Sequence, residues 1–184
     1  MISIGFIGFG LIGGSIAKCL KKQNNFCHIT VYSRDMKEKP TDGVIDHLTL
    51  DVSKESFGNC DIIFLCAPVL ININYLSELI KISKPDCLLT DVGSVKGNIH
   101  AEATRLGLSH RFIGGHPMTG SEKTGYENAS LTLLENAYYL LTPGENTTTD
   151  QLTFLKKLIS YTGAVCFELG FKEHDDITAA ISHV

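Results

Sequence analysis

The sequence lacks the features that would place a protein in a membrane, on nucleic acid or outside the cell. No apolar run approaches the ~20 residues that a membrane-spanning helix needs. The 16 lysines and arginines are outnumbered by 20 acidic residues, so no broad basic face is available for nucleic acid. The apolar start is broken by glycines and follows no basic segment, unlike a secretion signal. We therefore expect a cytoplasmic protein without a membrane or nucleic-acid partner.

The sequence also lacks any Cys-x-x-Cys spacing, although it contains six cysteines. Cys60, Cys66 and Cys87 lie in or beside apolar runs, where cysteine behaves as a small buried apolar side chain. A disulfide framework is typical of small secreted domains, whereas a chain of 184 residues can bury a sizeable core without cross-links. We therefore expect reduced thiols and no metal site.

Short apolar runs alternate with segments of helical periodicity along the chain. The runs expected to form strands are residues 2–7, 28–32, 60–67, 87–92, 111–113, 138–141 and 165–169. Helical periodicity marks residues 11–20, 70–82, 95–106 and 150–161. Residues 114–125 are too rich in glycine, proline and threonine for a regular element, so we expect a loop there. This alternation predicts an α/β fold with a doubly wound, mostly parallel sheet.

A glycine-rich turn follows the first predicted strand and opens the first predicted helix. Its residues are Gly8, Phe9, Gly10, Leu11, Ile12 and Gly13. Gly8 permits a tight turn, Gly10 lets the backbone approach a pyrophosphate, and Gly13 allows the helix to pack closely on the strand. The pyrophosphate then meets unpaired N–H groups at the positive end of the helix dipole. This strand–turn–helix context predicts a Rossmann domain that binds a dinucleotide cofactor.

The end of the second predicted strand decides which cofactor the domain prefers. A position about 20 residues beyond Gly13 falls on Ser33, which is followed by Arg34 and Asp35. A serine followed by an arginine suits the 2′-phosphate of NADP, because a guanidinium matches the geometry of phosphate. If the intervening loop is two residues longer than usual, Asp35 accepts a hydrogen bond from the ribose of NAD instead. The pattern favours NADP and leaves NAD open.

Two further segments leave predicted strands at the sheet edge where ligands of open α/β folds bind. They are residues 91–97, Asp-Val-Gly-Ser-Val-Lys-Gly, and residues 114–125, Gly-Gly-His-Pro-Met-Thr-Gly-Ser-Glu-Lys-Thr-Gly. Ser94 falls where a helix is expected to begin, so it is a candidate N-cap as well as a candidate site residue. His116 lies between glycines and a proline, where a histidine can accept a proton or hydrogen bond from a substrate hydroxyl.

The glycine-rich turn and these two segments together resemble the motifs of the prephenate dehydrogenase family, in order and at family spacing. His174-Asp175 and Ile181-Ser182-His183 resemble the start of that family's helical domain, so the resemblance covers essentially the whole chain. It implies the oxidative decarboxylation of prephenate to 4-hydroxyphenylpyruvate, with hydride transfer to NAD(P)+, in tyrosine biosynthesis. Arogenate dehydrogenases share the fold and the chemistry, so arogenate is the alternative substrate.

The resemblance also implies roles for individual residues. His116 would accept a hydrogen bond from the ring hydroxyl of the substrate, and Ser94 would bridge that hydroxyl, the histidine and the nicotinamide. Ser121 and Glu122 would line or gate the substrate pocket, to which His183 would also contribute. Besides the glycine-rich turn and residues 33–35, the residues that would contact the cofactor are Ala67, Pro68 and Gly93.

A new helical pattern opens after Gly170 and has not ended at Val184. An amphipathic helix of this kind cannot bury its apolar face alone. We therefore expect a dinucleotide-binding domain at residues 1–170 and, at residues 171–184, the beginning of an all-helical substrate and dimerisation domain that is otherwise absent. In the family, a further histidine and an arginine that hold the substrate carboxylates lie in that domain. This chain alone is therefore expected to show little or no turnover, and the full-length protein to be a homodimer.

Two other functions fit parts of the pattern. A β-hydroxyacid dehydrogenase shares the glycine-rich start but relies on a lysine in a later helix, and the nearby candidate is Lys96. A non-catalytic nucleotide-sensing module would bind the cofactor without using His116 for chemistry. The segment around His116 favours the prephenate dehydrogenase interpretation over the β-hydroxyacid dehydrogenase, and only replacement of His116 separates it from the sensing module.

Overall fold

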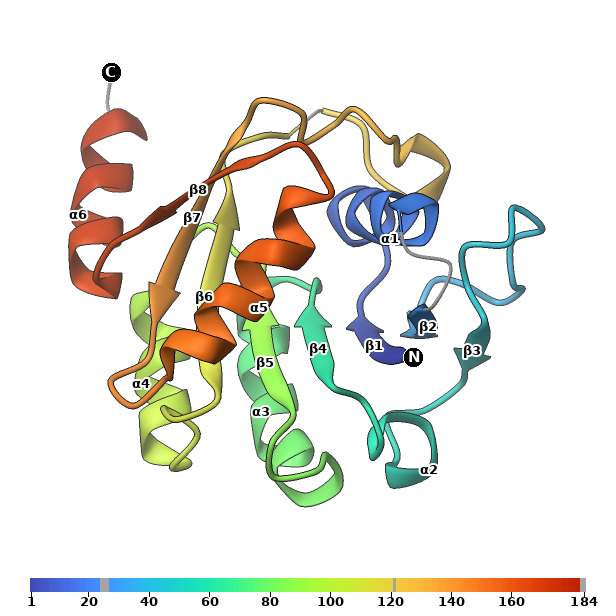
Figure 1. The fold of residues 1–184 in the computed structure, drawn as a ribbon, viewed down its shortest axis with the longest axis horizontal. Coiled ribbons are helices and arrows are strands. Elements are labelled where there is room, and N and C mark those ends of the chain that lie inside the picture. Colours follow the sequence, from blue (N-terminus) through green and yellow to red (C-terminus); the bar gives the residue numbers. More distant parts are fainter. Residues whose placement is uncertain (24–26, 121, 183–184) are drawn as a thin grey trace.

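A computed structural model of the chain describes residues 1–23, 27–120 and 122–182. Its sheet has eight strands in the order β3-β2-β1-β4-β5-β6-β7-β8 (Figure 1). The strands are β1 (Ile2–Ile7), β2 (Cys27–Tyr32), β3 (His47–Thr49), β4 (Ile62–Leu65), β5 (Leu88–Asp91), β6 (Phe112–Pro117), β7 (Tyr138–Pro143) and β8 (Val165–Glu168). Strands β1 to β6 are parallel to their neighbours, β7 pairs antiparallel with β6, and β8 is parallel to β7. The expected mostly parallel α/β sheet is confirmed.

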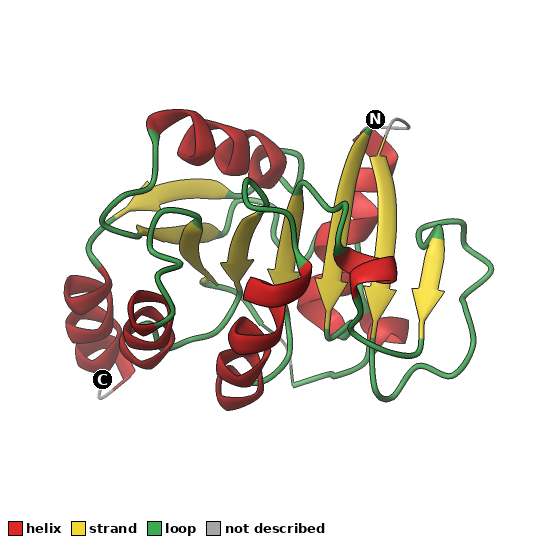
Figure 2. Ribbon diagram, turned by 90° about the horizontal axis from the view of Figure 1, so that it is seen from below, coloured by secondary structure: helices red, strands yellow, loops and turns green. Residues whose placement is uncertain are grey.

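Helices cover both faces of this sheet (Figures 1 and 2). The helices are α1 (Leu11–Gln23), α2 (Lys54–Phe57), α3 (Val69–Ile82), α4 (Gly97–Arg105), α5 (Thr149–Ser160) and α6 (Phe171–Ser182), with a 3₁₀ turn η1 (Tyr126–Asn128). Ile4 and Phe6 of β1 belong to one apolar core with residues of α1 and α5, whereas Ile7 belongs to a second core with residues of α3 and α4. Alternate strand residues therefore feed opposite cores, as a doubly wound sheet requires.

The apolar patterns locate the main elements because central parallel strands are buried on both faces. All four residues of β4 are buried, which explains an apolar run without polar interruptions. The short strand β3, the single-turn helix α2 and the turn η1 were not expected, since three or four residues carry too little periodicity to detect. Among the described residues, no helix is long and apolar enough to cross a membrane. The six cysteines are free thiols, as expected, and Cys60 and Cys87 are buried.

The expectation of a loop throughout residues 114–125 is wrong for the first part of that segment. Strand β6 continues to Pro117, and its residue Gly114 lies opposite Thr142 of β7. A Cβ atom at Gly114 would lie 2.3 Å from the Thr142 hydroxyl, and one at Gly115 would lie 2.5 Å from the Asp91 carbonyl oxygen. The glycines therefore allow close approach within a sheet rather than loop formation. His116 consequently lies on a strand.

Ser94 does not occupy the N-cap position for which it was a candidate. Helix α4 begins at Gly97, with Lys96 at the N-cap position and no side-chain capping bond from it. The amides of Lys96 and Gly97 instead each donate a 2.8 Å hydrogen bond to the carboxylate of Asp175, a residue of α6. A carboxylate at this position also complements the positive end of the helix dipole. A tertiary contact has thus replaced the local cap.

Candidate active site

A cleft of about 840 Å³ opens at the carboxyl ends of β1, β2 and β4. Its lining residues are Gly8, Phe9, Gly10, Tyr32, Ser33, Arg34, Asp35, Met36, Lys37, Glu38, Cys66, Ala67, Pro68, Ile71, Tyr75, Thr124, Gly125, Tyr126 and Glu127. Ligands of open α/β sheets bind at this edge. The structure therefore brings together three groups of predicted cofactor residues, from the glycine-rich turn, the end of β2 and the end of β4.

The glycine-rich turn leaves space where a pyrophosphate would lie. Gly8 has a φ of 83°, and a Cβ atom there would lie 2.5 Å from the amide nitrogen of Ala67. A Cβ atom at Gly13 would lie 3.1 Å from the sulfur of Cys66, so this glycine allows α1 to approach β4. At Gly10, by contrast, the nearest atom would be 4.0 Å away. With no acidic residue in the first turn of α1, the open space and the helix N-terminus fit a dinucleotide phosphate.

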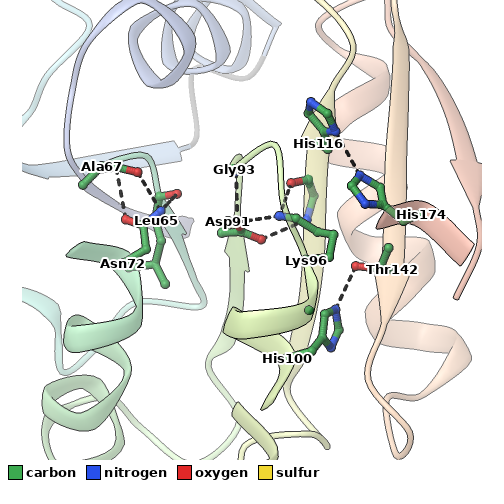
Figure 3. Close-up of polar contacts among 12 residues, drawn as sticks. Leu65, Ala67, Asn72, Asp91, Gly93, Lys96, His100, His116, Thr142 and His174 are labelled. Carbon is green, nitrogen blue, oxygen red and sulfur yellow. Dashed lines mark hydrogen bonds and ion pairs between the residues drawn. The ribbon is translucent and has the colours of Figure 1, made fainter. Parts of the chain in front are cut away.

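A buried asparagine shapes the β4 side of this cleft. The Asn72 side chain accepts a hydrogen bond from the Ala67 amide at 3.1 Å and donates to the carbonyl oxygens of Leu65 and Ala67 at 3.1 and 2.8 Å (Figure 3). These three bonds hold the turn in which Ala67 and Pro68 face the cofactor cleft. The apolar periodicity of α3 does not reveal this residue, because its role depends on a turn before the helix.

The third part of the cleft follows β2, where the ribose of a dinucleotide is expected. Ser33, Arg34 and Asp35 all line the cleft. The Arg34 and Asp35 side chains are more than four-fifths exposed and form an ion pair with a 3.2 Å Nε–Oδ1 distance. Exposed pairs of this kind are weak, so the guanidinium can exchange the carboxylate for a phosphate at little cost.

A segment that the sequence did not single out covers the start of α1. The Tyr126 ring stacks on Phe9 with ring centroids 4.9 Å apart, and its hydroxyl donates to Asp42 at 2.5 Å. A Cβ atom at Gly14 would lie 2.6 Å from the Tyr126 ring, so this glycine makes room for it. Tyr126 therefore connects the loop after β6 to the cofactor cleft.

A second cleft, of about 710 Å³, lies where β5 and β6 end. Its lining residues are Ser94, Val95, His116, Pro117, Met118, Thr119, Asp175, Thr178 and Ala179. Ser94 and His116, predicted from separate segments, therefore face one space. Helix α6 forms the remaining wall, so residues far along the chain contribute to the same site.

A buried ion pair lies directly beneath this second cleft. The Lys96 ammonium and the Asp91 carboxylate are fully buried, with a 2.5 Å Nζ–Oδ2 distance. Lys96 also donates to the Gly115 carbonyl oxygen at 2.7 Å, and Asp91 accepts from the amides of Gly115 and Gly93 at 3.2 and 2.9 Å. Burial lowers the pKa of Lys96, although Asp91 acts in the opposite direction. The pair joins the ends of β5 and β6 immediately before His116 (Figure 3).

His116 is held from one side by a histidine of α6. Its Nδ1 atom lies 2.9 Å from Nε2 of His174, and Nδ1 of His174 lies 2.8 Å from Oδ1 of Asp175. Figure 3 shows the other ring nitrogen of His116 pointing away from His174. Burial, then the neighbouring His174 and Lys96, lower the pKa of His116 to about 4. The imidazole is therefore neutral near pH 7 and able to accept a proton.

The other residues predicted for the site do not line either of these two clefts or lie outside the described residues. Leu11 and Ile12 open α1, and Gly93 lies in the turn between Asp91 and Ser94. Glu122 is exposed and lines neither of the two clefts formed by described residues, so its role stays a prediction. Two further predicted residues, Ser121 and His183, lie outside the described residues. Within the described part of the chain, no cluster of His, Cys, Asp and Glu could hold a metal ion.

Sequence comparison identifies relatives over most of the chain. A family model described as "Prephenate dehydrogenase, nucleotide-binding domain" matches residues 16–168. A prephenate dehydrogenase of Lactococcus lactis subsp. cremoris is 37% identical over 188 residues, an alignment that covers 100% of this chain and 51% of the relative. The chain spans about half the length of the curated prephenate dehydrogenases it matches.

Solved structures show the same relation. A prephenate dehydrogenase from Aquifex aeolicus, crystallised with hydroxyphenyl propionate and NAD+, has a TM-score of 0.86 at 28% identity and is matched over 100% of this chain and 65% of its own. An arogenate dehydrogenase from Synechocystis has a TM-score of 0.87 at 33% identity, with 99% and 64% covered. From the matched motifs, the fold and these relatives, we conclude that the chain belongs to the prephenate dehydrogenase family, as its nucleotide-binding domain.

Proposed function

We propose that this chain is the cofactor-binding and proton-accepting part of a dehydrogenase that converts prephenate and NAD(P)+ into 4-hydroxyphenylpyruvate, carbon dioxide and NAD(P)H. The observation that carries the proposal is the position of His116. It is a neutral imidazole with one nitrogen already bonded to His174, on a cleft shared with Ser94. Family membership in the prephenate dehydrogenases supplies the reaction class.

Few protein groups are needed for this reaction because the substrate supplies most of the driving force. When bound, the oxidised nicotinamide supplies the acceptor for the hydride that leaves the hydroxyl-bearing ring carbon. At the same time, the C–C bond between the ring and its carboxylate breaks, and the carboxylate leaves as carbon dioxide. The electron pair of this bond aromatises the ring, and the hydroxyl becomes the phenol of the product. His116 would share the hydroxyl proton while positive charge grows on that oxygen, and Ser94 would orient the hydroxyl. General-base assistance of this kind contributes roughly 10²–10⁴-fold.

Replacement of His116 tests this proposal. In the full-length protein, His116→Ala should lower kcat for prephenate by about 10²–10⁴-fold and leave NAD(P) affinity within about twofold. Ser94→Ala should have a smaller effect in the same direction. Unchanged kcat in His116→Ala would refute the proposal and favour the nucleotide-sensing module. Parallel assays with arogenate address the alternative substrate, which the similarity to the Synechocystis arogenate dehydrogenase supports.

We further propose that the cofactor preference is NADP, with NAD as the alternative. Ser33 and Arg34 follow β2 and line the cleft, and the Arg34 guanidinium is free to reorient because its pair with Asp35 is exposed. Arg34→Ala should weaken NADP binding about tenfold and leave NAD binding unchanged, in a thermal-shift titration that detects ligands of the native state. Equal losses for both cofactors, or tighter NAD binding in the starting protein, would assign the ribose to Asp35 instead.

The division of the protein is part of the same proposal. Residues 1–170 would be the dinucleotide-binding domain, and α6 would begin a helical domain that completes the substrate site and forms a homodimer. Six free thiols suit the reducing cytoplasm, where we place the enzyme. The 184-residue chain alone should therefore bind NAD(P) and show little turnover. Rapid oxidation of prephenate by residues 1–184 would refute this division.

A further inference from the structure

His174 and Asp175 of α6 lie beside His116, and the proposed reaction gives neither of them a role. His116 contacts His174, which contacts Asp175, and Asp175 contacts the backbone at the start of α4. We infer that His174 and Asp175 are positioning residues that fix the tautomer of His116, so that Nδ1 carries the proton and Nε2 presents a free lone pair to the cleft. This inference rests on the proposed role of His116 as the acceptor.

The direction of each hydrogen bond follows from Asp175, which is bonded to the backbone of α4. Oxygens of Asp175 accept from the Lys96 amide, the Gly97 amide and the His174 ring, each at 2.8 Å. Burial alone would raise the pKa of Asp175, but these donors outweigh burial and lower it. The carboxylate is therefore ionised at neutral pH and can only accept. Nδ1 of His174 must then carry a proton that it donates to Asp175.

The remaining protons follow in the same way. The inference places a single proton on the His174 ring. Because Nδ1 carries that proton, Nε2 of His174 is the acceptor in its 2.9 Å contact with His116. Nδ1 of His116 is then the donor, and Nε2 of His116 is left without a proton. This nitrogen points away from His174 in Figure 3. An Asp that sets the tautomer of a catalytic histidine is known from hydrolase triads, but here a second histidine lies between the two groups.

The contacts from His116 to Asp175 are held rigidly because they join three elements, β6, α6 and α4. His174 is fully buried, Asp175 closes the first turn of α4, and His116 lies on β6 within the sheet. Among the described residues, the charged groups around this chain of contacts are the Lys96–Asp91 pair, beneath β6. The titratable His100, which bonds to Thr142 and stacks on Phe171 of α6, also lies nearby. When His116 takes up a proton, its Nδ1–H keeps its acceptor and the Asp175 charge offsets the new cation.

Nitrogen NMR of the histidine rings tests the tautomer directly, without any assay of activity. In the ¹⁵N-histidine-labelled 184-residue chain at pH 7, Nδ1 of His116 should give a protonated-type shift and Nε2 an unprotonated-type shift, assigned by loss of the signals in His116→Gln. The opposite tautomer in the unaltered protein would overturn the inference.

Kinetics of the full-length protein test the consequence. His174→Leu should lower kcat about 10–100-fold with unchanged cofactor affinity, and His174→Gln, whose side-chain oxygen can still accept from His116, should recover part of the loss. The matched control is Asp176→Asn, since Asp176 lies on the same helix and is exposed. If His116→Ala abolishes turnover while His174→Leu keeps full kcat, the inference fails and the proposed function stands. If His116→Ala is fully active, the proposed function fails, and the NMR measurement alone decides the tautomer.

Discussion

Removal of the Lys96 ammonium is the perturbation with the largest expected effect on stability. The Lys96 and Asp91 side chains are both fully buried, and their only described ionic partners are each other. Lys96→Met would leave the Asp91 carboxylate buried with two backbone amides and no cation. Breaking a buried pair in this way typically costs about 3–5 kcal/mol. For a domain of this size, that corresponds to a decrease in Tm of roughly 6–20 °C.

The pKa of Lys96 indicates what the double variant should do. Burial lowers this pKa in spite of Asp91, so the cost of dehydrating the ammonium exceeds its attraction to the carboxylate. Lys96→Met combined with Asp91→Asn removes both charges and should recover most of the lost stability. Urea denaturation of the two single variants and the double variant gives the coupling free energy.

A more exposed ion pair provides the control for this experiment. Lys84 and Asp61 are 2.6 Å apart, but about a third of each side chain is exposed. Lys84→Met should therefore cost only about 0–1 kcal/mol. A loss below about 1 kcal/mol in Lys96→Met, or a double variant less stable than both single variants, would refute the account of the buried pair.

Three further predictions concern packing, pH and the phosphate cradle. Tyr139 is fully buried and its hydroxyl has no hydrogen-bond partner among the described residues, so Tyr139→Phe should leave the urea-measured free energy of unfolding unchanged or raise it by about 1 kcal/mol, and a clear loss would reveal a partner. Burial, then Lys96, lowers the pKa of His100 to about 4, so the unfolded chain binds a proton below about pH 6.5 that the folded chain does not. The free energy of unfolding should thus fall by about 2–3 kcal/mol between pH 6.5 and 4 because of this group, with no further loss from it at lower pH. His100→Gln should flatten this pH dependence, and the exposed His110→Gln should not. A steeper fall in His100→Gln would contradict the lowered pKa of His100. Gly10→Ala should keep the Tm and weaken NAD(P) binding at least tenfold, whereas Gly13→Ala, which crowds Cys66, should lower the Tm. Calorimetry and titration that show the reverse order would contradict the proposed binding of the pyrophosphate at Gly10.

The sequence predicted the parts of this structure that depend on local pattern. The glycine-rich turn is recognisable because its three glycines meet the requirements of a single turn and the helix that follows it. Strand β4 is recognisable because burial on both faces leaves no polar residue in it. Ser94 comes shortly after β5 and His116 lies near the carboxyl end of β6, and parallel strands carry such residues to one edge, so the sequence could predict that they share a cleft.

The parts that could not be predicted depend on contacts between distant segments. The acceptor for the first amides of α4 is Asp175, 78 residues beyond Gly97, so a nearby serine was the better local candidate and was nevertheless wrong. The pairing of Asp91 with Lys96 is close in sequence, but its burial depends on the Gly115 backbone of the next strand. The continuation of β6 through two glycines depends on β7, which runs in the opposite direction.

The docking of α6 has a consequence for how the protein can be divided. The matched family segment ends at residue 168, before the helix that carries His174 and Asp175. A protein cut at that boundary would retain its phosphate cradle and every strand of its sheet, yet the imidazole of His116 would lose its only described ring partner. We therefore expect nucleotide affinity and the proposed orientation of the His116 base to be separable, so that excision of the last helix keeps the first and abolishes the second.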